Sequence, residues 1–149
     1  MIRRRPNKAF LFCLGILVGL ALASCGKKGP PFFAPKEAFD VRVSALQGEW
    51  EEGYALLSGT VLGPKQATDR VTGCRVFYGQ YSAANAPCDG CPIEYQGYYG
   101  FGRETIEAGA LACKVPAKGK GRIYFFRVQL VGSNETLGPS SNTVRVDVK

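Results

Sequence analysis

The chain has 149 residues, with 19 Lys and Arg against 12 Asp and Glu, and it contains no histidine. This length is enough for one domain with a sizeable hydrophobic core. Without histidine, the chain cannot form a Ser-His-Asp or Cys-His catalytic group, and it lacks the commonest metal ligand. These reaction classes are therefore excluded.

A basic start and a short apolar run open the chain. Four basic residues lie within residues 1–8, and the apolar run covers residues 9–22. This run has the length of a signal-peptide core and is shorter than the about 20 residues that a spanning helix needs. It ends in Leu-Ala-Ser-Cys at residues 22–25, which resembles a bacterial lipobox. We predict a cleaved signal peptide over residues 1–24. An uncleaved N-terminal membrane anchor is the alternative.

Cleavage before Cys25 would make this residue the lipidated start of the mature protein. Diacylglycerol and an N-acyl chain such as palmitate give a stable anchor, because one acyl chain alone binds only reversibly. Gly26 follows, where an Asp would resemble an inner-membrane retention signal, so we predict the periplasmic face of the outer membrane. Losing residues 1–24 lowers the net charge from +7 to about +3. Nucleic acid is therefore not an expected partner.

Residues 25–37 are expected to form an extended linker, because they are rich in proline and glycine. Residues 25–31 read Cys-Gly-Lys-Lys-Gly-Pro-Pro. They are similar to the Cys-Gly-x-Lys-Gly-Pro start of a small proteobacterial lipoprotein family. One member of that family assists maturation of the outer-membrane lipopolysaccharide translocon. This resemblance implies an alternative function, in which residues 25–31 act as an assembly factor for that translocon.

From residue 38 to residue 149 the pattern is that of β-strands. Apolar and polar residues alternate in short segments, and turn signals rich in Gly, Pro, Asn and Asp separate them. Such spacing predicts an all-β, seven-stranded antiparallel β-sandwich. One helical turn is expected at residues 103–108. The expected strands cover residues 41–46, 54–62, 71–78, 93–101, 111–115, 122–131 and 142–148.

Two of these strands resemble those of a fibronectin type III domain. Residues 71–79 read VTGCRVFYG and residues 124–130 read YFFRVQL, followed by a turn at Gly132 and by GPSSN at 138–142. The resemblance covers residues 38–149 and implies an immunoglobulin-like sandwich without naming a ligand. The chain departs from the family in two places. Its only Trp, Trp50, precedes the second strand, and the segment 79–107 is long and carries two cysteines.

Six cysteines divide by their place in the chain. Cys13 leaves with the signal peptide and Cys25 carries the lipid, so four remain in the domain. An even number in an exported domain predicts two disulfides. We expect Cys74 to bond Cys113, because both occupy inward strand positions, and Cys88 to bond Cys91. The longer bridge would stabilise the domain by about 4 kcal/mol in the chain-entropy model.

The Cys88-x-x-Cys91 spacing leaves alternatives open. A thiol–disulfide oxidoreductase needs such a pair at a helix N-terminus, whereas this pair lies in a Gly- and Pro-rich segment. Zinc bound by four cysteines is a further alternative, although only one such pair exists. Covalent haem is excluded, because Pro92 stands where a His is required. We expect no metal or cofactor beyond the lipid, and Glu104 and Glu107 to be surface residues rather than a glycosidase pair.

Aromatic residues concentrate around the Cys88–Cys91 segment. Most of them are expected to pack on the sheets, because Tyr and Phe favour pleated surfaces. Tyr81, Tyr98 and Tyr99 are expected to reach solvent and to form a partner-binding surface. The sequence thus predicts a non-catalytic binding or assembly module whose partner is an envelope protein or glycan.

Overall fold

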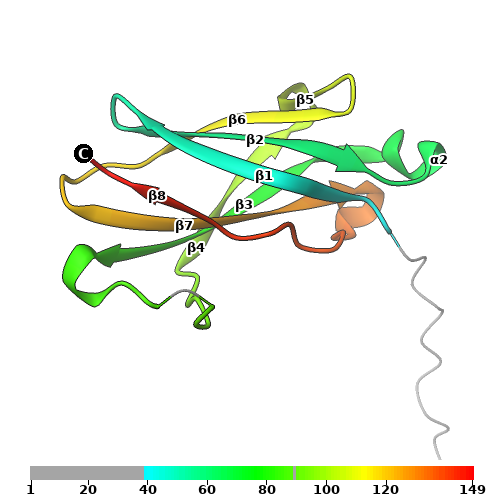
Figure 1. The fold of residues 1–149 in the computed structure, drawn as a ribbon. Helices are drawn as coiled ribbons and strands as arrows, with labels where there is room; N and C mark the ends of the chain where they lie inside the picture. Colours follow the sequence, from blue (N-terminus) through cyan, green and yellow to red (C-terminus); the bar gives the residue numbers. More distant parts are fainter. Residues whose placement is uncertain (1–38, 89) are drawn as a thin grey trace, which may run out of the picture. The chain divides into compact units, whose positions relative to one another are not determined.

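The computed structural model describes residues 39–88 and 90–149, which form a β-sandwich of two four-stranded antiparallel sheets (Figure 1). The β1 sheet has the strand order β1 (Arg42–Glu51), β2 (Tyr54–Leu62), β6 (Ala110–Pro116) and β5 (Ile106–Glu107). The β3 sheet has the order β4 (Gly97–Gly102), β3 (Val71–Ser82), β7 (Arg122–Gly132) and β8 (Val144–Asp147). The predicted all-β antiparallel sandwich is confirmed, with one strand more than expected.

The additional strand, β5, lies where a helical turn was predicted. A 3-10 turn, η2 (Arg103–Thr105), is present, but the chain then pairs Ile106 with Leu111. Ala108 and Gly109 have φ values of 48° and 79°. Two consecutive positive φ values are typical of a tight hairpin turn, which explains why the helix does not continue. Three further short helical segments are α2 (Lys65–Thr68), η1 (Ala83–Asn85) and η3 (Ser133–Glu135).

The hydrophobic core lies between the two sheets. On β3 the residues Val71, Cys74 and Val76 are buried, as the alternation predicted, and Tyr78 packs against them. Opposing side chains come from both sheets, because successive residues of a strand point to opposite faces. The largest fully buried side chains are Phe126, Leu57, Leu111, Leu130, Val41, Val43, Val76, Val115 and Val128.

Strand β4 begins at Gly97, four residues later than the predicted strand over residues 93–101. Residues 93–96 instead belong to the connection from β3. The closing strand is also shorter than predicted, because β8 begins only at Val144. Asn142, which precedes it, instead forms two hydrogen bonds with β1. The Leu46 N–H donates to Asn142 Oδ1 at 2.9 Å, and Asn142 Nδ2 donates to the Leu46 carbonyl at 2.9 Å.

The predicted signal peptide, the lipidated Cys25 and the linker over residues 25–37 lie outside the described residues. Within residues 39–88 and 90–149, no helix has the length and hydropathy to cross a membrane.

Candidate functional site

The described part of the connection between β3 and β4, residues 83–88 and 90–96, folds back onto the outer face of the β3 sheet. Phe125 and Ile123 point to this face, yet they are only 7% and 4% exposed. At Gly79, a Cβ would lie 2.7 Å from the Glu94 carbonyl oxygen and 3.1 Å from Ile93 Cγ2. Only glycine allows the returning segment to come this close. The long segment that departs from the fibronectin pattern is therefore a cover on one face of the sandwich.

Tyr81 holds this cover in place. Its hydroxyl accepts a hydrogen bond from the Glu94 N–H at 2.9 Å and donates one to the Glu94 carbonyl at 3.1 Å. Its ring meets Phe125 edge-on, with centroids 5.8 Å apart. The ring is half-buried, so the structure places Tyr81 as a support of the loop rather than as a free contact residue.

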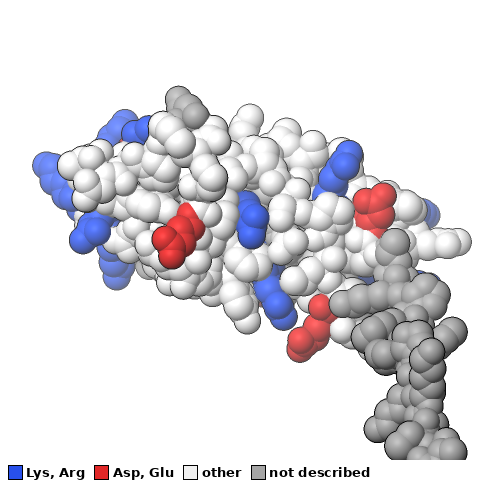
Figure 2. All heavy atoms as spheres, turned by 90° about the horizontal axis from the view of Figure 1, so that it is seen from below, with Lys and Arg blue, Asp and Glu red and all other residues white. Residues whose placement is uncertain are grey.

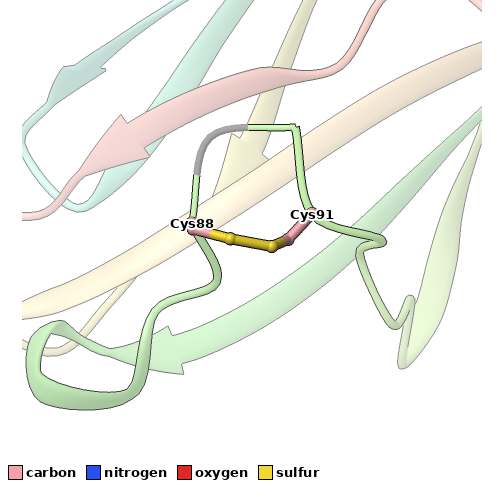
Figure 3. Close-up of a disulfide and its surroundings, with 2 residues drawn as sticks. All are labelled: Cys88 and Cys91. Atoms are coloured by element: carbon pink, nitrogen blue, oxygen red, sulfur yellow. A yellow bond between two sulfur atoms is a disulfide. The ribbon is translucent and has the colours of Figure 1, made fainter.

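Cys88 and Cys91 are joined by a disulfide within the cover, as predicted (Figure 3). Their Cα atoms are 5.3 Å apart, and the Cys91 N–H donates to the Cys88 carbonyl at 3.0 Å. A hollow beside the bond is lined by Ile93, Phe125, Thr143 and Arg145. The pair lies in a loop and not at the N-terminus of a helix, so the fold supplies none of the dipole that lowers the pKa of a redox-active thiol.

The predicted disulfide between Cys74 and Cys113 is not formed, and both residues are free, buried thiols. Cys74 is on β3 and Cys113 on β6, so the two residues belong to opposite sheets. A disulfide needs Cα atoms within about 7 Å of each other, a condition that only some facing pairs of a sandwich meet. Alternation placed both side chains inward, but it carried no information on the distance between them. The Cys74 sulfur instead lies 3.8 Å from Thr105 Oγ1.

Five side chains form a continuous stack on the outer face of the β3 sheet, which we call the stacked row. In order they are Arg75, Tyr98, Phe77, Arg127 and Tyr95. The Arg75 guanidinium lies 5.0 Å from the Tyr98 ring centroid, and the Tyr98 and Phe77 centroids are 5.6 Å apart. The Arg127 guanidinium lies 5.2 Å from the Phe77 centroid and 4.2 Å from that of Tyr95. Three of these contacts join a cation to the face of a ring, and the ring quadrupole makes such contacts attractive.

Arg127 is the distinctive member of the stacked row. Its Nε is buried and has no hydrogen-bond partner among the described residues. Arg75 is 3.7 Å from the Glu135 carboxylate, but the Glu135 side chain is 86% exposed, so this ion pair is weak. Figure 2 views the domain from this side and shows both basic and acidic side chains on a largely uncharged surface, with several basic side chains gathered at one end. The row thus offers guanidinium donors beside rings, a combination that suits an acceptor-rich partner.

The three tyrosines predicted to reach solvent differ in their environment. Tyr98 is 53% exposed. Tyr99 faces inward, packs against the core and lies 5.1 Å from the Tyr78 ring, and burial raises its pKa above the usual value. The structure therefore brings Tyr98 together with the stacked row and assigns Tyr81 and Tyr99 to packing.

The remaining members of the stacked row carry no recognisable motif. Arg75 and Phe77 are two residues apart on β3, and Phe77 pairs with Arg127 of the neighbouring strand β7. Period-two alternation places Arg75 and Phe77 on one face. Their contact with Tyr95 could not be read from the sequence, because it depends on the path of the cover.

Carboxylates and metal ligands do not gather into a second site in the described part of the chain. It contains no cluster of three or more Cys, Asp or Glu that could hold a metal ion. Glu104 accepts a hydrogen bond from the Gly102 N–H at 3.2 Å, and both Glu104 and Glu107 are exposed.

Two solved structures share this architecture. The third fibronectin III domain of the human KIAA0343 protein is 14% identical, with a TM-score of 0.55 over 83% of this chain and 93% of that one. The fold is fibronectin type III-like. A structure described as a myokine is 12% identical, with a TM-score of 0.50 over 73% of this chain and 97% of that one. No protein-family model matches the sequence, and no curated protein matches it either.

Within this fibronectin type III-like sandwich, Trp50 takes a place of its own. It is the next-to-last residue of β1 and does not lie on β2, and its indole Nε1 donates to the Ala117 carbonyl at 3.1 Å. The chain therefore has a Trp packed against the core, but this Trp lies on the first strand and not on the second, where the resemblance implied it.

Proposed function

We propose that this protein is a lipid-anchored, non-catalytic binding or assembly module of the bacterial envelope. The lipobox-like residues 22–25 support an anchor at Cys25, and the predicted location is the periplasmic face of the outer membrane. The fibronectin type III-like fold is consistent with a binding module and names no partner.

The observation that carries the proposal is the stacked row. Tyr and Arg are the side chains most enriched among interface residues that dominate binding energy. Here Tyr98 is exposed and flanked by Arg75, whose side chain is 26% exposed. We propose an envelope protein or glycan bearing carboxylate or carbonyl acceptors as the partner of this face.

The anchor is tested by metabolic labelling with radioactive or alkyne-tagged palmitate. The wild-type chain is expected to incorporate label and to fractionate with the outer membrane. The Cys25→Ser variant is expected to incorporate none, because a hydroxyl cannot form the thioether. Equal labelling of both chains would contradict lipidation at Cys25, and retention of residues 1–24 on an unlabelled chain would favour the uncleaved anchor.

Co-purification from chemically crosslinked envelopes tests the partner surface against the translocon alternative. A variant of the face, Arg75→Glu with Tyr98→Ala, is expected to lose the partner. A variant of the linker, Pro30→Ser with Pro31→Ser, is expected to retain it. The opposite pattern would support an assembly factor acting through residues 25–31.

The thiol–disulfide alternative is tested with an insulin-reduction assay in the presence of a dithiol reductant. The wild-type chain is expected to match a Cys91→Ser control, because the Cys88–Cys91 pair lies in a loop. Activity above that control would instead support an oxidoreductase.

A further inference from the structure

The four strands that border the two sheets differ in how they are protected from pairing with another chain. Natural edge strands carry charges, prolines or bulges, or are kept short, because an exposed edge presents unpaired N–H and C=O groups. Strand β1 carries Arg42, Glu49 and Glu51 and a register shift between Ser44 and Gln47. Strand β8 has four residues that include Arg145 and Asp147, and β5 has only two residues.

Strand β4 has none of these protections. Its sequence, Gly-Tyr-Tyr-Gly-Phe-Gly over Gly97–Gly102, contains no charge and no proline. It pairs with β3 in one continuous register from Gly73–Gly102 to Tyr78–Gly97, and it borders the β3 sheet. No described strand lies on its other side. Among the edges of the described domain, β4 is therefore the one suited to accept a further strand.

The sequence of β4 is complementary to itself. When two copies run antiparallel about Tyr99, Tyr98 lies opposite Gly100, and Phe101 lies opposite Gly97. Residues that lie directly opposite in a sheet point to the same face, and this register keeps Tyr98 and Gly100 on the outer face. On the outer face, Tyr98 of each copy thus meets Gly100 of the other, an arrangement in which the ring covers exposed backbone. Phe101 and Gly97 lie on the inner face, where Phe101 packs against the core of its own copy and the Tyr78 ring lies beside Gly97. The strand carries no charge, so the two copies do not repel each other.

The space around Gly100 fits this register. A Cβ on Gly100 would meet no atom within 4 Å, so the outer face is open there. Arg75 pairs with Gly100 across the β3–β4 ladder, and its guanidinium already leans toward β4, 5.0 Å from the Tyr98 ring. A Tyr98 ring from a second copy, lying over Gly100, would come beside the same guanidinium. Tyr98 is also the most exposed of the large hydrophobic side chains of the described residues, at 53%.

We propose that two copies of this chain associate through antiparallel β4–β4 pairing centred on Tyr99. The two β3 sheets then become one eight-stranded sheet, with a stacked row from each copy on the same outer face. A two-fold axis through the pair makes the contact self-complementary and closed. This inference does not depend on the proposed function, because it is argued from the edge of the sheet and not from what the outer face binds.

Cysteine crosslinking of full chains in the cell envelope tests the register. A Tyr98→Cys chain and a Gly100→Cys chain with a different tag are produced together, and the wild-type chain is the control. Opposite residues bring Cα atoms to about 4.5–5.5 Å, within the range of a disulfide. A disulfide-linked dimer carrying both tags is expected, and either variant alone is expected to give none. A Tyr99→Cys chain alone is expected to crosslink to itself.

A strong dimer of Gly100→Cys alone would overturn pairing about Tyr99. No crosslink between two copies from any variant, with the chains shown to be folded, would overturn the pairing altogether. Sedimentation of the full chain in mild detergent gives a second measurement. Tyr98→Lys places a cation beside Arg75 and is expected to weaken self-association at least ten-fold. Leu62→Lys, which alters an exposed side chain on β2, is the matched control and is expected to change nothing. Equal association of the two variants would contradict the proposal.

Discussion

At the scale of single residues, the two buried thiols show how burial controls chemistry in this domain. Burial raises the pKa of Cys74 to about 11 and that of Cys113 to about 12. The Thr105 hydroxyl opposes the rise at Cys74 and the charge of Glu104 adds to it, whereas the charge of the Cys74 thiolate adds to the rise in the pKa of Cys113. Since the thiolate is the reactive form, neither group is poised for redox or nucleophilic chemistry near neutral pH.

The first prediction concerns the reactivity of these thiols. In the folded chain at pH 8 without reductant, iodoacetamide is expected to label neither Cys74 nor Cys113, because both are buried and protonated. In denaturant both are expected to react within minutes. Mass mapping of the alkylated peptides measures the difference, with Leu62→Cys, at a position 44% exposed, as a positive control. A Cys74–Cys113 disulfide in the mapped peptides would contradict the free thiols of the structure.

The second prediction concerns stability against pH. A thiol whose pKa is higher in the folded chain than in the unfolded chain stabilises the fold fully below pH 9. That contribution is lost as the pH rises from about 9 toward 11 and 12. For Cys74, a shift of two pKa units corresponds to about 3 kcal/mol at most. Denaturant unfolding at pH 8 and pH 10.5 measures it. Cys74→Ala is expected to show a smaller loss than the wild-type chain, and an equal loss would contradict the assignment.

At the scale of elements, two hydrogen bonds between the Asn142 side chain and the Leu46 backbone of β1, which we call the clasp, link the two sheets. Ala45 has a φ of 50° at the register shift of β1, which leaves the Leu46 N–H and carbonyl without ladder partners. The Asn142 side chain satisfies both groups. A bulge of this kind bends the strand locally, and the pairing of β1 with β2 resumes at Gln47.

The third prediction follows from the clasp. Asn142→Ala leaves a donor and an acceptor of β1 unpaired, so it is expected to lower the free energy of unfolding by about 1–3 kcal/mol. Asn85→Ala, in the exposed η1 turn, is the matched control and is expected to change stability by less than about 0.5 kcal/mol. Urea unfolding followed by Trp50 fluorescence measures both variants. Equal stability of the two would show that the clasp contributes nothing.

Alternation predicted the strands better than it predicted their connections. The strands β2, β3 and β7 were found because their inward faces are continuous runs of apolar side chains. The β5 hairpin was missed because two paired residues leave no period to detect. Ile93 and Tyr95 alternate with polar residues, which predicts a strand over residues 93–96. These residues do lie on a sheet surface, but as a cover and not as a ladder strand.

The candidate site was predictable only in part, because it combines short-range and long-range contacts. Tyr98 is exposed because successive residues of a strand point to opposite faces, and the neighbouring Tyr99 points to the core. The Cys88–Cys91 bond is local, and four residues suffice to predict it. The contact of Arg127 with Phe77 and Tyr95 joins three segments far apart in the chain, so no local pattern reports it.

At the scale of the whole molecule, the described domain has two sheets with unlike outer faces. The β3 sheet carries the cover, the disulfide and the stacked row, and its β4 edge is unprotected. In the proposed account, the lipid on Cys25 anchors the domain in the envelope, and pairing of two copies places two stacked rows on one continuous sheet. The partner then meets a rigid sheet rather than a mobile loop, which lowers the entropic cost of binding.

Photocrosslinking in living cells tests the central claim most directly. A photoreactive amino acid is placed at position 98, in the stacked row, or at position 114, on the outer face of the β1 sheet. We expect position 98 to give a covalent adduct with an envelope component other than the chain itself, together with any self-adduct, and position 114 to give none. Equal adducts at both positions, or none from position 98 except the chain itself, would contradict a partner-binding role for this face.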